Sequence, residues 1–312
     1  MKYLVLDIGG SAIKYAVMTE TLEFLERGSE KTPLDSIESF VNVIGSIYDK
    51  YKDDICGMAI SMPGLLDSKK GYAYTGGALE YNNDKNIVEI LQKRCNTKIT
   101  IENDGKCAAL AELWQGSLKN YSDGVVIVLG TGVGGGIIRD GKVHRGKNFF
   151  AGEFSFIWTD DNGKKGNIGN WWGAKNGTKA LTDAVATVKA LPKEKVNGHL
   201  VFEYANNKDE EVLKILDKFT YDLAIQIYNL QCILDNEIVA IGGGISAQDI
   251  LLKYIKKNVD KVYDIVALNI PKPEITTCKF RNDANLIGAL YNFLGLENHK
   301  EIENVAISGI AK

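Results

Sequence analysis

The chain has 312 residues, which is long for a single hydrophobic core and predicts two domains. Its composition, with 45% hydrophobic and 25% charged residues and a formal net charge of −3, is typical of a globular protein and excludes nucleic acid or an anionic membrane as the main partner. The lack of a signal-peptide pattern and of any apolar run near ~18 residues, together with five scattered cysteines, leads us to expect a cytoplasmic protein with reduced thiols.

Short apolar runs alternate with amphipathic segments along the first third of the chain. The runs 2–8 and 12–18 flank one glycine turn and predict a β-hairpin. Asp35 and Glu38 form a capping-box pattern, which predicts a helix with Asp35 as its N-cap and Glu38 at the third helical position. The other elements expected here are a strand at 55–61, a helix from 87 to about 94 that Asn86 caps with Glu89, a strand at 98–101 and a helix at 104–114.

The same alternation restarts after a break near 116–123. An apolar strand at 125–129 leads into a turn with five glycines, and another strand begins at Ile137. The other elements expected here are a long loop at 159–176, helices at 179–191 and 210–234, a strand at 237–241, a helix that Ser246 caps with Asp249, a strand at 273–277 and a closing helix at 283–293. This alternation of strands and helices predicts α/β architecture.

Two segments about 120 residues apart share one plan. LVLDIGGSAIKYAVM (4–18) and VIVLGTGVGGGIIRD (126–140) each contain an apolar strand, a glycine turn with one hydroxyl residue, and a second apolar strand. The repeat predicts two similar lobes, each of which presents a glycine turn to a cleft.

Three glycine turns have the composition of phosphate-binding loops, because glycine permits close approach and successive amides form an anion nest. In the first, Asp7 precedes Gly9, Gly10 and Ser11, so a Mg²⁺ ligand adjoins a phosphate nest, although a plain hairpin turn has the same glycines. The second turn, 129–136, fits neither the P-loop nor the dinucleotide-binding spacing. The third, 242–246, is expected to join a strand to a helix N-terminus that suits a phosphate or ribose.

Glu102, Asn103 and Asp104 stand between a predicted strand and a predicted helix. One interpretation is that Asp104 is only the N-cap of that helix. The other is that Asp104 accepts a proton from a substrate hydroxyl.

The order and spacing of these motifs resemble the ROK family of bacterial sugar kinases, within the actin-like ATPase fold. The motifs that carry the resemblance are Asp7 to Ser11, Ser61-Met62-Pro63-Gly64, Glu102-Asn103-Asp104, Gly130 to Gly136, Ala151-Gly152-Glu153 and Gly242-Gly243-Gly244. The resemblance implies a two-lobed, duplicated actin-like ATPase (ribonuclease H-like) fold with a nucleotide cleft between the lobes. Residues 1–118, joined by a C-terminal helix at about 283–312, would form the first lobe and 119–282 the second.

The roles of site residues follow from the resemblance. It implies that Asp104 is the catalytic base and that ATP and Mg²⁺ are used, with Asp7 as the Mg²⁺ ligand. The residues implied to bind the sugar are Gly64, Asn103, Asp104, Glu153 and Trp172. The residues implied to bind ATP are Asp7, Gly9, Gly10, Ser11, Gly130, Thr131, Gly132, Gly243 and Gly244. A homodimer is implied as well.

The chain departs from the family at its structural zinc site. Phe156 stands at the position of a zinc-binding histidine, and no cysteine occurs between Cys107 and Cys232, so we predict no zinc. The segment 166–172 resembles a remnant of the zinc loop, in which Trp172 replaces a second sugar-binding glutamate. Trp171 and Trp172 would either form a stacking platform for a β-glucoside or N-acetylated sugar, or fill the space of the missing zinc site.

Sequence analysis therefore predicts ATP-dependent phosphorylation of a hexose, of an N-acetylhexosamine such as N-acetylmannosamine, or of a β-glucoside. A non-catalytic sugar-sensing regulator of the same family is the alternative. A DNA-binding repressor is disfavoured, because the first strand opens the chain and the net charge is near zero.

Overall fold

The computed structural model describes residues 1–159, 168–266 and 268–295, and the chain divides into two compact units. The first unit comprises Met1–Gln115, Gly141–Ala151 and the chain from Asp283 onward, and the second comprises Gly116–Asp140 and Gly152–Asn282. The segment Gly141–Ala151 lies in the first unit, although it falls within the 119–282 range expected for the second lobe. Residues 296–312 of the expected C-terminal helix lie outside the described part of the chain.

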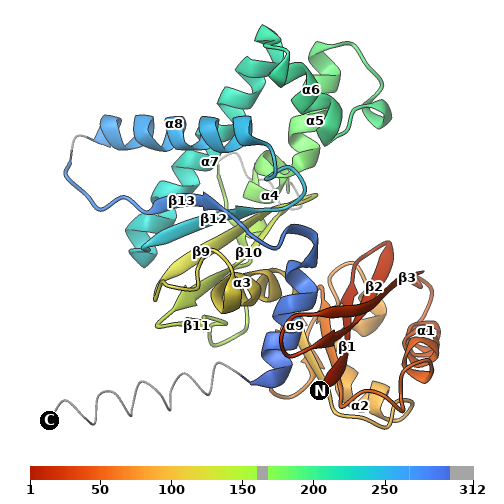
Figure 1. Ribbon diagram of the computed structural model, residues 1–312. Coiled ribbons are helices and arrows are strands. Elements are labelled where there is room, and N and C mark those ends of the chain that lie inside the picture. Colours follow the sequence, from red (N-terminus) through yellow and green to blue (C-terminus); the bar gives the residue numbers. More distant parts are fainter. Residues whose placement is uncertain (160–167, 267, 296–312) are drawn as a thin grey trace, which may run out of the picture. The chain divides into compact units, whose positions relative to one another are not determined.

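The first unit combines a five-stranded sheet, a small three-stranded sheet and four α-helices within its described residues (Figure 1). Its elements are β1 (Lys2–Ile8), β2 (Ala12–Thr19), β3 (Phe24–Lys31), α1 (Ile37–Asp49), β4 (Met58–Met62), β5 (Leu66–Asp67), β6 (Tyr72–Ala73), β7 (Lys85–Asn86), α2 (Ile87–Gln92), β8 (Ile99–Asn103), α3 (Asp104–Gln115), β11 (Lys142–Val143) and α9 (Ala284–Leu294).

The five-stranded sheet brings the ends of neighbouring strands into one row. Its order is β3-β2-β1-β4-β8, with β1 antiparallel to β2 and parallel to β4, and with β4 parallel to β8. The predicted first hairpin is therefore confirmed. In this register Asp7 lies opposite Ser61, and Ser61 lies opposite Glu102. The carboxyl ends of the three parallel strands thus place the first turn, Ser61 and the Glu102–Asp104 segment along one edge of the sheet.

Helices cover both faces of this sheet (Figure 1). Successive side chains of β1 point to opposite faces of the sheet. Leu4 and Leu6 belong to the buried cluster that includes residues of α1 and α2, whereas Tyr3 packs against Phe293 of α9. The N-cap of α1 is Ser36, whose Oγ accepts from a backbone amide, so the prediction that Asp35 caps this helix was wrong by one residue. The Asn86 cap of α2 is confirmed.

The second unit repeats the plan of the first. Its elements are β9 (Gly124–Leu129), β10 (Val133–Arg139), α4 (Trp172–Asn176), α5 (Thr178–Val188), α6 (Gly198–Asn206), α7 (Glu210–Leu234), β12 (Ile238–Gly242), α8 (Asp249–Val266) and β13 (Glu274–Thr277). The strands β10-β9-β12-β13 begin with an antiparallel hairpin and continue with parallel strands, as β2-β1-β4-β8 do. The predicted duplication of an actin-like fold is confirmed.

Three expectations for the second unit need correction. Ser246 does not cap α8, since its hydroxyl and amide donate to the carbonyl of Gly243 and the helix begins only at Asp249. The stretch 168–176, expected as loop, contains α4, while 160–167 lie outside the described residues. Sequence analysis missed α6, although Asn197 caps it and Val201, Phe202 and Ala205 recur on its buried side.

None of the helices in the described ranges is long and apolar enough to cross a membrane.

Candidate active site

The first glycine turn is held in place by the strand that follows β2. The amide of Gly9 donates to the carbonyl of Ala12, closing the turn between β1 and β2. Thr32, which is buried, donates its hydroxyl to the Gly9 carbonyl and its amide to the Ser11 carbonyl. The carbonyl groups of Gly9 and Ser11 therefore have partners in the protein, which fits a loop whose remaining amides face a ligand.

Asp7 is a half-buried carboxylate that fits a magnesium ligand. Ser61 Oγ and Asn285 Nδ2 donate to its Oδ1 at 3.2 and 3.0 Å. Within the described part of the chain, Oδ2 accepts no hydrogen bond. Burial is the main cause that raises the pKa of Asp7, and the hydrogen bonds and Lys14 oppose the rise. A single carboxylate with one open oxygen matches the protein's usual contribution to a Mg²⁺–nucleotide site.

We expect Asp7→Asn to separate stability from activity. Because the folded state raises the pKa of Asp7, the protonated carboxyl group stabilises the fold. This contribution is fully present at pH values below the pKa of the unfolded state, and it is lost as the pH rises through the pKa of the folded state. At pH 7 the asparagine, whose Oδ1 can accept from Ser61 and Asn285, should leave the melting temperature equal or higher. The kcat/KM should fall by about a hundredfold or more through loss of the metal ligand.

Thermal unfolding and initial rates at several Mg²⁺ concentrations check this expectation. Asp209→Asn is a suitable comparison, since Asp209 caps α7 by accepting from the amide of Val212, a role that asparagine can also fill. A variant at Asp7 with full activity would remove this residue from the metal site.

Asn103, and not Asp104, caps the helix that follows β8. Asn103 Oδ1 accepts from the amide of Lys106 at 3.1 Å, and α3 begins at Asp104. Asn103 Nδ2 donates to the carbonyl of Gly64 at 3.0 Å, which ties the two predicted sugar-binding residues together. The half-buried Asp104 accepts from the amide of Gly105 at 2.8 Å. The interpretation of Asp104 as the N-cap is therefore wrong, and its carboxylate stands in the first turn of the helix.

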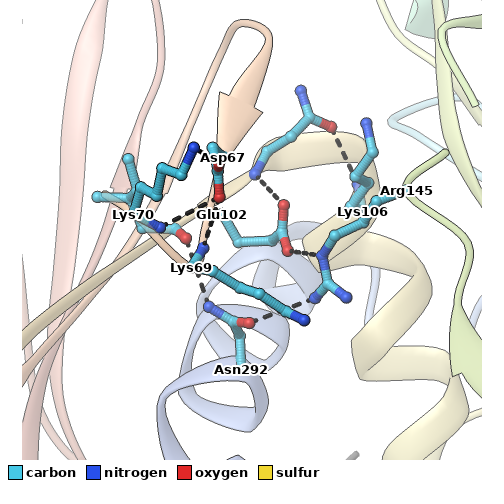
Figure 2. A network of polar contacts seen from close by, with 9 residues as sticks. Asp67, Lys69, Lys70, Glu102, Lys106, Arg145 and Asn292 are labelled. Carbon is cyan, nitrogen blue, oxygen red and sulfur yellow. Dashed lines mark hydrogen bonds and ion pairs between the residues drawn. The ribbon is translucent and has the colours of Figure 1, made fainter. Parts of the chain in front are cut away.

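An ion pair between Glu102 and Arg145 supports the Asn103–Asp104 segment (Figure 2). Glu102 is fully buried, and its Oε2 accepts from Arg145 Nε at 2.7 Å. Its Oε1 accepts from the amide of Asn103 at 2.8 Å. Arg145 also donates to Asn292 of α9 at 3.4 Å. The segment Gly141–Ala151 is thereby tied to the strand end that carries Asn103 and Asp104.

The second glycine turn is braced by a serine that sequence analysis did not select. Ser155 Oγ accepts from the amide of Val133 and donates to its carbonyl, at 3.0 and 3.1 Å. A Cβ at Gly132 would lie 2.7 Å from this hydroxyl, so glycine is required for the contact. The amide of Thr178, at the start of α5, donates to the carbonyl of Gly130.

A cavity of about 530 Å³ adjoins the second and third turns. Of the residues of these two turns that are predicted to bind ATP, Gly130, Thr131 and Gly244 line it, whereas Gly132 and Gly243 do not. Sequence analysis missed most of the remaining wall, which includes Thr178, Lys179, His199, Phe202, Ile245 and Gln248. Several of these residues come from α5 and α6, far from the glycine motifs in sequence.

The third turn contains two glycines with different requirements. Gly243 has φ +92°, and a Cβ there would collide with the backbone of Leu129, so its role is to allow close packing. A Cβ at Gly244 meets no atom within 4 Å, and Gly244 lines the cavity. We expect Gly244→Leu to keep the melting temperature and to raise the KM for ATP about tenfold or more.

Gly243→Ala should instead lower the melting temperature, because alanine is strained at a positive φ and its Cβ would collide with the backbone of Leu129. Steady-state kinetics with varied ATP and thermal unfolding of both variants distinguish these effects. An unchanged KM for ATP in a folded Gly244→Leu variant would exclude the cavity as the nucleotide site.

The predicted sugar-binding residues are found in different surroundings. Gly64 has φ +118° and packs against the carbonyl of Thr75, where a side chain would collide. Glu153 is half-buried and precedes a short 3₁₀ turn. Trp172 is fully buried and packs against Phe154 at a ring distance of 5.6 Å. The structure therefore favours the interpretation that Trp172 fills the core over the interpretation that it offers an open platform.

Other aromatic rings near Glu153 are exposed. Phe156 is 45% and Trp158 53% exposed. Phe156 meets the half-buried Trp171 edge to face at 5.1 Å, and Trp158 pairs with Trp171 through a β-bridge. Residues 166 and 167 of the supposed zinc-loop remnant lie outside the described residues. Among the described residues no group of three or more His, Cys, Asp or Glu side chains could hold a metal ion.

The duplicated fold and the likeness to known sugar kinases identify a carbohydrate kinase. The model of the ROK family matches residues 3–295, and the chain belongs to this family. It is 29% identical to the β-glucoside kinase of Listeria monocytogenes, over 96% of this chain and all of that protein. It is 28% identical to the N-acetyl-D-glucosamine kinase of Histophilus somni, over 94% of this chain and 99% of that protein.

The solved structures include a similar protein with a bound sugar. A ROK family protein from Streptococcus pneumoniae, in complex with sucrose, has a TM-score of 0.85 and 27% sequence identity. The match covers 96% of this chain and all of that one.

Proposed function

We propose that the protein transfers the γ-phosphate of ATP to a hydroxyl group of a β-glucoside, with Asp104 as the general base. The observation that carries this proposal is that Asn103 and Asp104, at the end of β8, have different roles. Asn103 performs the capping of α3, so the helix does not need the Asp104 carboxylate as its N-cap. A half-buried carboxylate at the carboxyl end of a parallel strand is well suited to accept the proton of a bound hydroxyl.

The transfer itself requires little covalent chemistry from the protein. Asp104 takes the hydroxyl proton while the sugar oxygen bonds to the γ-phosphorus and the bond to ADP breaks. Asn103 is rigidly held by its bonds to Lys106 and Gly64, and the second hydrogen on Nδ2 can reach a sugar hydroxyl.

The nucleotide is assigned to the glycine turns. Gly10 and Ser11 of the first turn, and Thr131 and Gly132 of the second, would hold phosphate groups through their amides and hydroxyls. The amides of Gly9 and Gly130 donate within their own turns, so these two glycines would serve by letting the backbone approach the phosphate closely. The cavity of about 530 Å³ would take the adenosine, with Gly244 in its wall and Gly243 supporting the turn. Asp7 would hold Mg²⁺, which neutralises charge on the transferred phosphoryl group when bound.

The choice of a β-glucoside is supported by the exposed rings of the second unit. Aromatic faces cover the apolar faces of sugars and of aryl aglycones. Phe156 and Trp158 present such surface within five residues of Glu153. The β-glucoside kinase of Listeria monocytogenes aligns with 96% of the chain at 29% identity, and the Streptococcus pneumoniae structure holds sucrose, a two-ring sugar.

A coupled ADP-release assay with MgATP tests the proposal. The acceptors would be glucose, mannose, fructose, N-acetylmannosamine, N-acetylglucosamine, cellobiose and aryl β-glucosides. We expect the highest kcat/KM for a β-glucoside, and we expect Trp158→Ala to raise the KM for an aryl β-glucoside about tenfold while changing that for glucose little.

Ile233→Ala, which removes another exposed apolar side chain, serves as the matched control. A preference for an N-acetylated sugar would overturn the β-glucoside assignment and keep the kinase. Bound ATP without turnover on any acceptor would favour the sugar-sensing regulator.

A further inference from the structure

The first unit contains a cavity of about 540 Å³ that the proposed transfer reaction does not use. It lies between the turn that follows β5 and the loop that follows β11. The first contributes Asp67, Lys69 and Lys70, and the second contributes His144, Arg145 and Lys147, together with Gly146 and Phe149. Its volume falls in the range of small-molecule sites. It shares no lining residue with the cavity beside the glycine turns.

The lining of this basic cavity is strongly cationic. Four side chains carry positive charge and only Asp67 carries a negative one, so the formal charge is +3 with His144 neutral. Glu102, which does not line the cavity, pairs with Arg145, so the net charge of the lining together with Glu102 is +2. Lys69, Lys70 and Lys147 are exposed, so they stay hydrated and mobile enough to meet an anion.

The two loops are nevertheless fixed by the fold. Asp67 is 4% exposed, and its Oδ1 accepts from the amides of both Lys69 and Lys70 at 3.1 Å, which shapes the first loop. Arg145 is held by Glu102 and Asn292, which anchors the second loop (Figure 2). The cations are thus attached to pre-organised backbone, which lowers the cost of ordering them around a ligand.

The cavity also offers an apolar surface. Phe149 adopts φ +61° and stacks on Tyr74 with a ring distance of 5.9 Å and an interplanar angle of 21°. A positive φ in a bulky residue is strained, so this position of the ring is imposed by its surroundings. A ring beside several cations suits a ligand that has a carbon skeleton and an anionic group.

We propose that this basic cavity binds the phosphate group of a sugar phosphate. A phosphate monoester presents three oxygens and nearly two negative charges, which matches several cations from two loops better than a single carboxylate does. The ligand would be either a sugar that already carries a phosphate and serves as the acceptor, or a phosphorylated sugar that acts as an effector. In both cases Arg145 connects the site, through Glu102, to the backbone amide of Asn103.

Histidine NMR resonances provide a site-specific readout that does not depend on turnover. The sequence has three histidines, and the two described ones line different cavities: His144 the basic cavity and His199 the one beside the glycine turns. The full chain would be titrated with glucose 6-phosphate, with glucose and with inorganic phosphate, and His144→Gln would assign the His144 signal. We expect glucose 6-phosphate to shift the His144 resonance with saturation below about 20 mM, and glucose alone to leave it unchanged.

Charge variants test whether the lysines create the site. Lys69→Gln/Lys147→Gln should weaken the binding of glucose 6-phosphate about tenfold or more. Lys52→Gln/Lys93→Gln removes the same charge from other exposed positions of the first unit and should leave binding unchanged. Equal binding by the two double variants, or no shift of the His144 resonance in the unsubstituted protein, would overturn the proposal.

Kinetics then distinguish the two sources of the phosphate. Competition of glucose 6-phosphate with the neutral acceptor sugar would place its phosphate in an extension of the acceptor site. A change in kcat without competition would identify an effector site. An inactive preparation that still shows the His144 shift would contradict the proposed kinase function and leave the binding site standing.

Discussion

Replacement of Asp104 by asparagine is expected to lower kcat by about 10²–10⁴-fold and to leave the melting temperature unchanged. The asparagine Oδ1 can still accept from the amide of Gly105, and Asn103 continues to cap α3 through Lys106. The fold therefore keeps these two hydrogen bonds. What is lost is a carboxylate that can take the proton of the sugar hydroxyl.

The measurement is steady-state kinetics with saturating MgATP, together with ATP binding by calorimetry, which should be retained. Asp209→Asn is the matched control, because Asp209 is an N-cap aspartate whose Oδ1 accepts from the amide of Val212. Asparagine caps helices about as well as aspartate, so this variant should keep its kcat. If Asp104→Asn turned over the sugar as fast as the unsubstituted protein, Asp104 would be a structural residue.

Removal of the Arg145 guanidinium is expected to destabilise the first unit by about 3 kcal/mol or more. Arg145→Met leaves the carboxylate of Glu102, which is fully buried, without its cationic partner. Desolvation of a lone charge costs more than the pair gains, so removal of one partner is worse than removal of both. We also expect kcat to fall, since Glu102 positions the amide of Asn103 next to Asp104.

A double substitution distinguishes loss of the ion pair from loss of packing. In Glu102→Gln/Arg145→Met the buried charge is gone, and the glutamine Oε1 still accepts from the amide of Asn103, so most of the lost stability should return. Arg139→Met breaks a more exposed pair with Asp123 and should cost no more than about 1 kcal/mol. Equal losses for Arg139→Met and Arg145→Met, measured by chemical denaturation, would contradict a special role for the buried pair.

Local patterns in the sequence determined the elements whose hydrogen bonds close within a few residues. The hairpin around Gly9 and Gly10 follows from two β-branched runs and a glycine turn, and the structure contains it. The helix α7 begins and ends at Glu210 and Leu234 as predicted, because Asp209 caps it and its apolar residues recur at helical spacing. The duplicated plan was also visible in sequence, since both copies preserve the same strand–turn–strand order.

Caps were harder to predict because adjacent polar residues compete for the same amides. Asp35 and Ser36 stand side by side, as do Asn103 and Asp104, and either member of each pair can cap a helix. The path of the preceding chain selects Ser36 in one case and Asn103 in the other. That selection matters in the second case, since it relieves Asp104 of the capping role.

Only the tertiary structure decided which distant residues share a site. Arg145 reaches Glu102 across 43 positions, Thr32 and Asn285 support the first turn from other elements, and His199 joins a cavity with Thr131. Burial was likewise not readable from the motif, since Trp172 lies in the core while Trp158 is exposed. Local propensity and periodicity act over one or two turns of chain, whereas ion pairs, cavities and burial arise from packing between elements, which a single sequence does not specify directly.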